Sequence, residues 1–195
     1  MILDAARASS RVTSSATLMD MRIVIAHGAS GDASSMQAHV DGFEQRGLAA
    51  TAIDLPLRKA EAAVHAYREQ AEALDATPGG LVVSGQSYGG RVASLLAAEQ
   101  PGNVAGLVCF SYPLHRPGQA DWDERSRHWA SIGVPVLFLS GESDPFARID
   151  LLRRAIDERL PGSRLVTYPK VGHSLKAVLD DVLDRASAFV VDLGR

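Results

Sequence analysis

The sequence predicts an α/β fold: a mostly parallel, six-stranded sheet with helices on both faces. Short, unbroken runs of Val, Ile, Leu and Ala alternate with helical stretches along the chain after residue 20. A strand covered on both faces is apolar throughout, so such runs are typical of a parallel sheet between two helical layers. The 195 residues suffice for one domain with a sizeable core, which we expect at 21–195.

The expected elements follow one another as strand, loop and helix. Arg22–Ala26 is an apolar run and precedes a helical stretch over 34–46. Alanines recur near one face of a longer expected helix over 60–75, and Pro101 must end the helix that follows the third strand. The other strands are expected at 49–53, directly before Gly85, and at 104–110, 135–140 and 164–168, and the other helices at 121–131, 149–160 and 175–193.

Residues 1–20 form no part of this alternation. They carry Arg7 and Arg11 among Ala, Ser and Thr but have no apolar core, which argues against a secretory signal. We expect a disordered N-terminal extension without a catalytic role.

The stretch Gly85-Gln-Ser87-Tyr-Gly89 joins an apolar run to an Ala- and Leu-rich helical stretch. A strand, a sharp turn with small flanking residues and a helix are the context of a nucleophile elbow, which exposes its serine above the sheet. Ser87 is therefore the candidate nucleophile. The alternative is an ordinary Gly/Ser turn between a strand and a helix.

A serine nucleophile needs a general base and an acid that orients the base. His173 follows the sixth expected strand, where the base belongs, whereas the other histidines lie on expected helices or precede the acid. Asp144 follows the fifth strand and is the expected acid. Glu142 in the same loop is the fallback, and Asp144 has the alternative role of capping the next helix.

The turn also predicts where an oxyanion would be held. The amide directly after the nucleophile, that of Tyr88, and an amide from the loop after the first strand are the expected donors. In His27-Gly28-Ala29 the second donor would be Ala29. The glycines of this loop have the alternative role of plain turn residues.

Composition limits the classes of binding partner that we expect. The net charge of −3 gives no overall basic field, so we expect neither nucleic acid nor an anionic membrane as a partner. The single cysteine, Cys109, lies in an apolar run and indicates a buried thiol in a reducing compartment, hence a cytoplasmic protein. No His, Cys or Asp cluster has metal-ligand spacing, so no metal or cofactor is expected. The oligomeric state stays open.

Together these residues resemble the α/β-hydrolase superfamily from Met21 to the C-terminus. The segments Gly85-Gln-Ser-Tyr-Gly-Gly-Arg91, Ser111-Tyr-Pro-Leu-His-Arg-Pro117 and Val136-Leu-Phe-Leu-Ser-Gly141 look like its small dienelactone-hydrolase-like branch, which includes the testis-expressed and NSL-complex-subunit proteins. Members of that subfamily typically carry arginine where this chain has Gln86. The resemblance implies a minimal six-stranded core.

The resemblance also suggests local roles after the fourth strand. We expect His27, Tyr112 and His115 to contribute to substrate binding. The alternative is that the loop from Ser111 to His115 is rigid and packs its tyrosine in the core. Only the short helix at 121–131 stands where the fold often inserts a lid, so we expect an open site for small substrates.

The predicted function is a serine hydrolase that cleaves a small ester or thioester through a Ser87-His173-Asp144 triad and an acyl-enzyme. One alternative is an inert binding or scaffold protein on the same fold. Another is a nucleotide-binding Rossmann domain, since Gly28 and Gly31 follow the first strand and Asp54 ends the second. The loop lacks the G-x-G-x-x-G pattern of that class.

Overall fold

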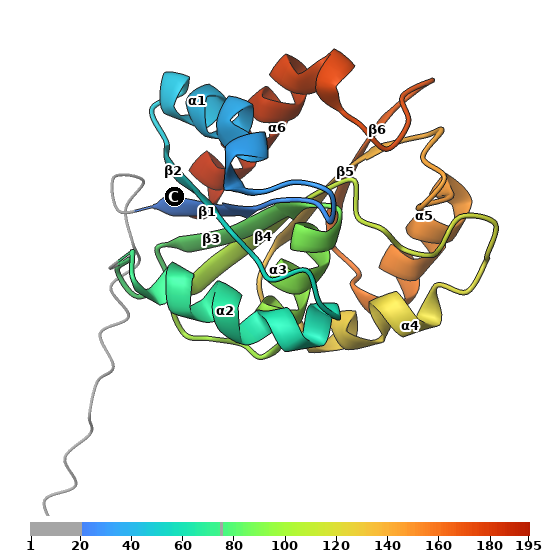
Figure 1. Cartoon of the computed structure of the whole chain (residues 1–195), viewed down its shortest axis with the longest axis horizontal. Coiled ribbons are helices and arrows are strands. Elements are labelled where there is room, and N and C mark those ends of the chain that lie inside the picture. The colour runs from blue at the N-terminus through green and yellow to red at the C-terminus, as the bar shows by residue number, and fades with distance from the viewer. Residues whose placement is uncertain (1–20, 75) are drawn as a thin grey trace, which may run out of the picture.

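The computed structural model describes residues 21–74 and 76–195. The predicted N-terminal extension, residues 1–20, lies outside the described residues. The described part forms a sheet between two helical layers (Figure 1).

Six strands form one sheet in the order β2-β1-β3-β4-β5-β6, and every neighbouring pair is parallel. The predicted six-stranded sheet is therefore confirmed. The order reverses at β1 and β3, and in parallel sheets such a reversal opens a crevice outside the carboxyl ends of the strands. The strands are β1 (Arg22–Ala26), β2 (Ala49–Ile53), β3 (Leu81–Gln86), β4 (Val104–Phe110), β5 (Val136–Gly141) and β6 (Arg164–Tyr168).

The helices divide between the two faces of the sheet (Figure 1). One core cluster joins α1 and α6 to the sheet, and the other joins it to α2, α3 and α5. The strands are covered on both sides, which explains their continuous apolar character. The helices are α1 (Gln37–Gln45), α2 (Ala60–Glu72), α3 (Tyr88–Ala98), α4 (Asp123–Ser126), α5 (Ile149–Arg159) and α6 (Leu179–Leu193).

Three of the expected helices contain a 3₁₀ turn. The helix expected at 34–46 begins as η2 (Ala33–Met36), whose first turn Asp32 caps by accepting a hydrogen bond from the Ser35 amide. The closing helix likewise begins as η4 (Lys176–Val178). The segment at 121–131 divides into α4 and η3 (Arg127–Ser131). Between β4 and β5, residues 111–135 contain only these two short helices. This agrees with the prediction that no large lid is present.

Cys109 lies in β4 and is buried, as predicted. Burial raises the pKa of its thiol, because a thiolate has no solvating partner in the core. Among the described residues, no helix has the length and apolar character needed to cross a membrane. The cytoplasmic location stays a prediction.

Candidate active site

Three side chains from three strand ends meet at the carboxyl edge of the sheet. Ser87 follows β3, Asp144 follows β5 and His173 follows β6. The Ser87 hydroxyl lies 2.9 Å from Nε2 of His173, and Nδ1 of His173 lies 2.8 Å from Oδ2 of Asp144. These are hydrogen-bond distances along one line. The structure thus brings the three predicted residues together.

The turn at Ser87 has the strained backbone of an elbow. Ser87 has a φ of 50°, a conformation that a residue with a Cβ rarely adopts. Its amide donates to the Phe110 carbonyl at 2.8 Å, which holds the turn against β4. A Cβ at Gly85 would overlap the backbone of Gly89, and one at Gly89 would overlap the backbone of Ala26. Glycine is therefore required at both positions.

The acid is held by its own loop. Asp144 is only 3% exposed, and its Oδ1 accepts a hydrogen bond from the Phe146 amide at 2.8 Å, so Oδ2 is left for His173. Helix α5 begins at Ile149 with Arg148 as its N-cap, so Asp144 does not cap that helix. Glu142, the fallback acid, instead accepts from the Thr167 hydroxyl at 2.8 Å.

Two loops are joined at Gly141 to bring the acid to the base. A Cβ there would overlap the carbonyl of Val171, and the Ser143 amide donates to the same carbonyl at 2.9 Å. The loop after β5 therefore lies directly against the loop after β6. This contact sets the separation of Asp144 and His173.

The expected oxyanion donors stand free. The amides of Ala29 and Tyr88 donate to no acceptor among residues 21–74 and 76–195. Tyr88 is the first residue of α3, where the amides of a helix have no internal partner. Ala29 lines the same cleft as Ser87 and His173. The positions agree with the predicted hole, whose catalytic use belongs to the proposal below.

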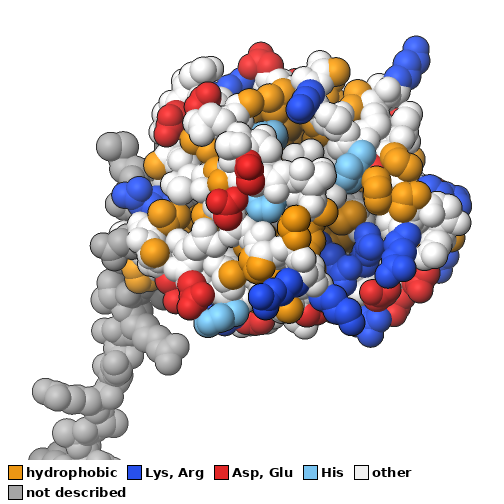
Figure 2. All heavy atoms as spheres, viewed as in Figure 1, with side chains coloured by type: hydrophobic (Ala, Val, Ile, Leu, Met, Phe, Trp, Pro, Cys, Tyr) orange, Lys and Arg blue, Asp and Glu red, His pale blue; other side chains and the backbone are white. Residues whose placement is uncertain are grey.

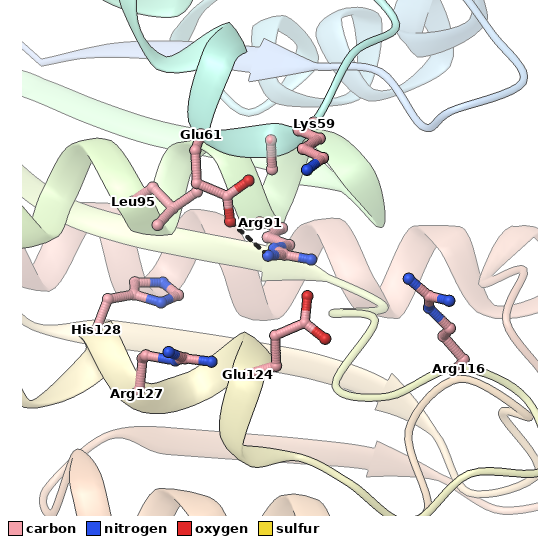
Figure 3. Close-up of a pocket in the computed structure, with 9 residues that line it drawn as sticks. Lys59, Glu61, Arg91, Leu95, Arg116, Glu124, Arg127 and His128 are labelled. Atoms are coloured by element: carbon pink, nitrogen blue, oxygen red, sulfur yellow. Dashed lines mark hydrogen bonds and ion pairs between the residues drawn. The ribbon is translucent and has the colours of Figure 1, made fainter.

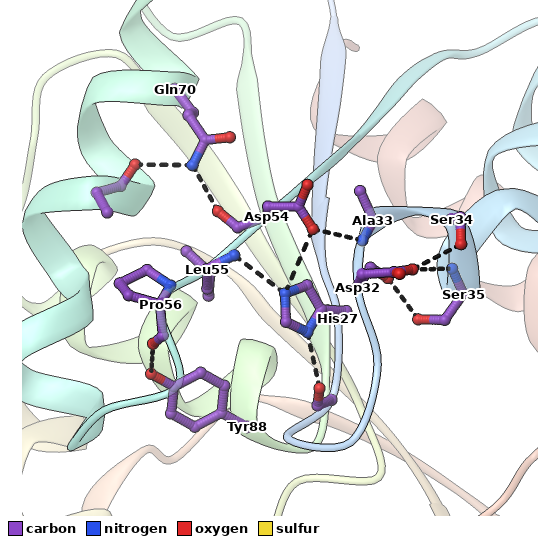
Figure 4. Close-up of polar contacts among 12 residues, drawn as sticks. His27, Asp32, Ala33, Ser34, Ser35, Asp54, Leu55, Pro56, Gln70 and Tyr88 are labelled. Atoms are coloured by element: carbon purple, nitrogen blue, oxygen red, sulfur yellow. Dashed lines mark hydrogen bonds and ion pairs between the residues drawn. The ribbon is translucent and has the colours of Figure 1, made fainter.

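His27 corrects the prediction of substrate contact, because its side chain is only 2% exposed. Its Nε2 accepts the Leu55 amide at 3.0 Å and its Nδ1 lies 2.7 Å from the Gly28 carbonyl (Figure 4). Nε2 is therefore the acceptor and Nδ1 the donor in these two contacts. His27 ties the loop that carries Ala29 to the end of β2.

Asp54 supports the same loop (Figure 4). Its Oδ1 accepts the Ala33 amide at 2.7 Å, and Gln70 binds the Asp54 carbonyl at 2.6 Å. The carboxylate that the nucleotide-binding alternative assigned to a ribose is therefore a loop anchor. This contact argues against that alternative.

Tyr112 and His115 also correct the substrate-binding prediction, being 1% and 2% exposed. Tyr112 packs edge-on against Trp129 and Phe138 and donates to the Arg125 carbonyl at 2.5 Å. His115 accepts the Arg148 amide at 2.9 Å. Both side chains are satisfied inside the protein, as the packed-loop alternative predicted, and no surface is left for a substrate.

Several cleft residues were missed by sequence reasoning. The ring of Phe146 lies 4.5 Å from the ring of His173, centroid to centroid, so it packs against the imidazole. Its position two residues after the acid is the only sequence signal for this role. Gln86, Ser35 and Lys176 also line the cleft, which has a volume of about 600 Å³.

A smaller pocket of about 240 Å³ adjoins this cleft. Ser35, Gln86 and Lys176 line both spaces. Because the Phe110 carbonyl accepts the Ser87 amide and Phe110 lines the pocket, the pocket lies beside Ser87. Its apolar walls come from Ala38, Phe110, Leu175 and Leu179.

No other histidine among the described residues forms a hydrogen bond with Ser87, although His39 lines the adjoining pocket. His65 is exposed on α2 and lies 3.3 Å from Glu69. Burial lowers the pKa of both His39 and His128 to about 4, so both are neutral near pH 7. The described residues contain no group of His, Cys, Asp or Glu arranged to hold a metal ion.

Comparison with known proteins agrees with this geometry. A monoacylglycerol lipase from Paleococcus ferrophilus superposes with a TM-score of 0.78 at 15% identity, over 91% of this chain and 96% of that one. A dienelactone hydrolase from Anabaena variabilis gives 0.72 at 22% identity, over 90% and 86%. At these identities the likeness establishes the fold alone.

The family follows from a direct sequence match. Residues 19–188 match the family described as the alpha/beta hydrolase domain, which is most of the chain. The predicted superfamily is confirmed, whereas the narrower likeness to testis-expressed and NSL-complex-subunit proteins stays a prediction. The chain belongs to the alpha/beta hydrolase family.

Proposed function

We propose that this protein is a serine hydrolase that cleaves a small ester or thioester through an acyl-enzyme. The observation that carries the proposal is a pair of hydrogen-bond contacts: Ser87 Oγ to His173 Nε2 at 2.9 Å, and His173 Nδ1 to Asp144 Oδ2 at 2.8 Å. A base within hydrogen-bond reach of a nucleophile, and oriented by a buried acid, is the arrangement that acyl transfer needs.

In the first half of the reaction, Ser87 Oγ attacks the substrate carbonyl carbon while its proton passes to Nε2 of His173. The carbonyl oxygen becomes an oxyanion, which the free amides of Ala29 and Tyr88 stabilise. Asp144 accepts the Nδ1 proton of His173 in a hydrogen bond and stabilises the imidazolium that forms. The tetrahedral intermediate then expels an alcohol or thiol, which takes the proton from Nε2.

In the second half, water enters the open cleft. His173 removes a proton from the water, whose oxygen attacks the acyl carbon bound to Ser87. Collapse of the second tetrahedral intermediate releases the acid and returns the proton to Ser87. Every proton that moves passes through Nε2, so the tautomer fixed by Asp144 matters in both halves.

The size of the pocket beside Ser87 supports a small acyl group. A volume of about 240 Å³ exceeds the roughly 150 Å³ of a cavity that holds one benzene molecule. The space therefore suits a short aliphatic or single-ring acyl group, and a long lipid chain would extend out of it. The substrate we propose is a small-molecule ester or thioester.

The test is covalent labelling with a fluorophosphonate probe, which reacts with activated serines. We expect the native chain to be labelled and Ser87→Ala to stay unlabelled. Ser131→Ala is the matched control, because Ser131 is exposed on η3 and its hydroxyl bonds to no described residue. Hydrolysis of short p-nitrophenyl esters should fall about 10³–10⁴-fold in Asp144→Asn, which favours the wrong tautomer of His173.

Absence of labelling in a folded native chain would contradict the proposal and favour the inert scaffold. Labelling that persists in Ser87→Ala would assign the reactive group to another residue. A panel of matched esters and thioesters would then identify the preferred leaving group.

A further inference from the structure

A second groove lies on the α2–α3–α4 side of the sheet. The first turn of α2, the start of α3, the loop after β4 and the α4–η3 segment meet around a space of about 690 Å³ (Figure 3). The Arg91 amide donates to the Ser87 carbonyl at 3.0 Å, so the groove begins one turn of α3 beyond the nucleophile. None of the residues that line the catalytic cleft lines this groove.

Basic side chains dominate this groove. Its four cations are Lys59, Arg91, Arg116 and Arg127, and its two acids are Glu61 and Glu124. The excess of two positive charges stands in a chain whose net charge is −3. Lys and Arg side chains gather at the lower right of the face in Figure 2, over the region where Figure 1 places α4.

These charges are mostly unneutralised. Arg91 binds Glu61 at 2.7 Å, while Lys59, Arg116 and Arg127 form no ion pair with any described acid. Nε of Arg91 is buried and has no hydrogen-bond partner among the described residues. A buried guanidinium donor without an acceptor is costly, so the single contact with Glu61 satisfies the Arg91 guanidinium only in part.

The neighbouring groups respond to this positive field. Burial, together with the charges of Arg91 and Arg127, lowers the pKa of His128 to about 4. The pKa of Arg125, behind the groove, is held below its ordinary value by burial and by the charge of Arg91. His128 is therefore neutral near pH 7, and its Nε2 is engaged with the Ser94 hydroxyl at 2.8 Å.

We propose that this groove binds a small molecule through its phosphate groups. Guanidinium groups from separate elements match phosphate oxygens in a bidentate fork, and an excess of two positive charges favours a ligand with at least two negative ones. The proposal does not depend on the reactivity of Ser87. It adds a site that binds anions beside the proposed catalytic cleft.

Substitution of Glu124 tests whether the charge of the groove determines binding. Its carboxylate lies among the cations of the groove (Figure 3), so it repels a bound anion. Replacing it by the isosteric glutamine should tighten binding, whereas replacing a cation should weaken it. A role in structural packing would not produce opposite effects of this kind.

The experiment is isothermal titration of the native chain with inorganic diphosphate at low ionic strength. We expect saturable binding that weakens as salt is added. Arg127→Gln should raise Kd by about fourfold or more, since one pair of unit charges at about 5 Å in a water-like medium accounts for about fourfold, and Glu124→Gln should lower it by a similar factor. Arg116→Gln removes a second exposed cation of the groove and tests the same effect.

Arg22→Gln is the matched control. Arg22 is exposed and begins β1, at the opposite end of the sheet, and removing it changes the net charge by the same amount. Diphosphate binding should be unchanged in this variant. No saturable binding, equal weakening in Arg22→Gln and Arg127→Gln, or weaker binding in Glu124→Gln would overturn the proposal. Because titration does not require catalysis, none of these results depends on the outcome of the labelling experiment.

Discussion

His39 should make the protein less stable in mild acid. The side chain lies on α1 and is 9% exposed, it packs edge-on against Phe110 at 5.1 Å between ring centroids, and it forms no hydrogen bond with a described residue. Burial lowers its pKa from 6.5 to about 4. In the unfolded chain the same ring is solvated and has its ordinary pKa.

The sign follows from which state binds the proton. As pH falls through 6.5 the unfolded chain becomes protonated at this residue, while the folded protein does not until about pH 4. Acid therefore favours the unfolded state, so the stability is complete above pH 6.5 and declines toward pH 4. With these two pKa values, the free energy of unfolding at pH 4.5 should fall by about 2.5 kcal/mol through His39 alone.

Urea denaturation at pH 7.5 and 4.5 measures this loss. We expect His39→Gln, which does not titrate, to lose about 2.5 kcal/mol less than the native chain between the two pH values. His65→Gln is the control, because the His65 side chain is 76% exposed and should leave the loss unchanged. Equal losses in His39→Gln and in the native chain would refute the reasoning.

Three further perturbations test the elbow, the core and the pocket. Gly85→Ala should destabilise the fold by roughly 3 kcal/mol or more, because the added Cβ meets the backbone of Gly89. Gly102→Ala is the control: its Cβ would stand in open space, so its urea midpoint should stay near that of the native chain. Equal midpoints for the two variants would contradict this account. Because burial raises the pKa of the Cys109 thiol, a disulfide reagent should react with it rapidly only in denaturant, and rapid reaction in buffer would count against a buried thiol. Ala38→Phe enlarges a side chain that lines the pocket and should reduce hydrolysis of p-nitrophenyl hexanoate relative to the acetate by roughly tenfold. Ala130→Phe on η3 should leave this ratio unchanged. An unchanged ratio in Ala38→Phe would argue that the acyl group lies elsewhere.

The alternation of elements and the three triad positions could be predicted because their signals are local. Ser87 follows an apolar run and precedes a helical one, and Asp144 and His173 each stand directly after an expected strand. Parallel strands place their carboxyl ends on one edge, so the order of elements along the chain was enough to bring the three loops together. The close approach of Gly141 to Val171, by contrast, joins two loops that are distant in the sequence and left no local signal.

The basic groove could not be predicted in this way. Its lining comes from residues 59–61, 91–95, 116 and 124–128, segments separated by other elements. None of them carries a recognisable motif alone, and the overall negative charge conceals a local positive excess. Only the packing of α2, α3 and the segment after β4 assembles it.

The histidines expected to contact substrate show a limit of a different kind. Sequence position placed His27 and His115 beside the active-site loops correctly but did not give the direction of either side chain. Both point inward and use the same two contacts. Nδ1 lies near the carbonyl of the next residue, at 2.7 and 2.9 Å, and Nε2 accepts an amide from another loop, at 3.0 and 2.9 Å.

The two histidines therefore act on the site through its backbone. His27 joins the loop of Ala29 to Leu55, and His115 joins the loop after β4 to Arg148, two residues beyond Phe146. The loop of Ala29 and the ring that packs on His173 each depend on an imidazole nitrogen that accepts a hydrogen bond. Substitution of either histidine by a residue without an acceptor at that position would move a loop rather than remove a substrate contact. Its effect should therefore fall on the rate of acylation for all substrates alike, and not on the choice among them.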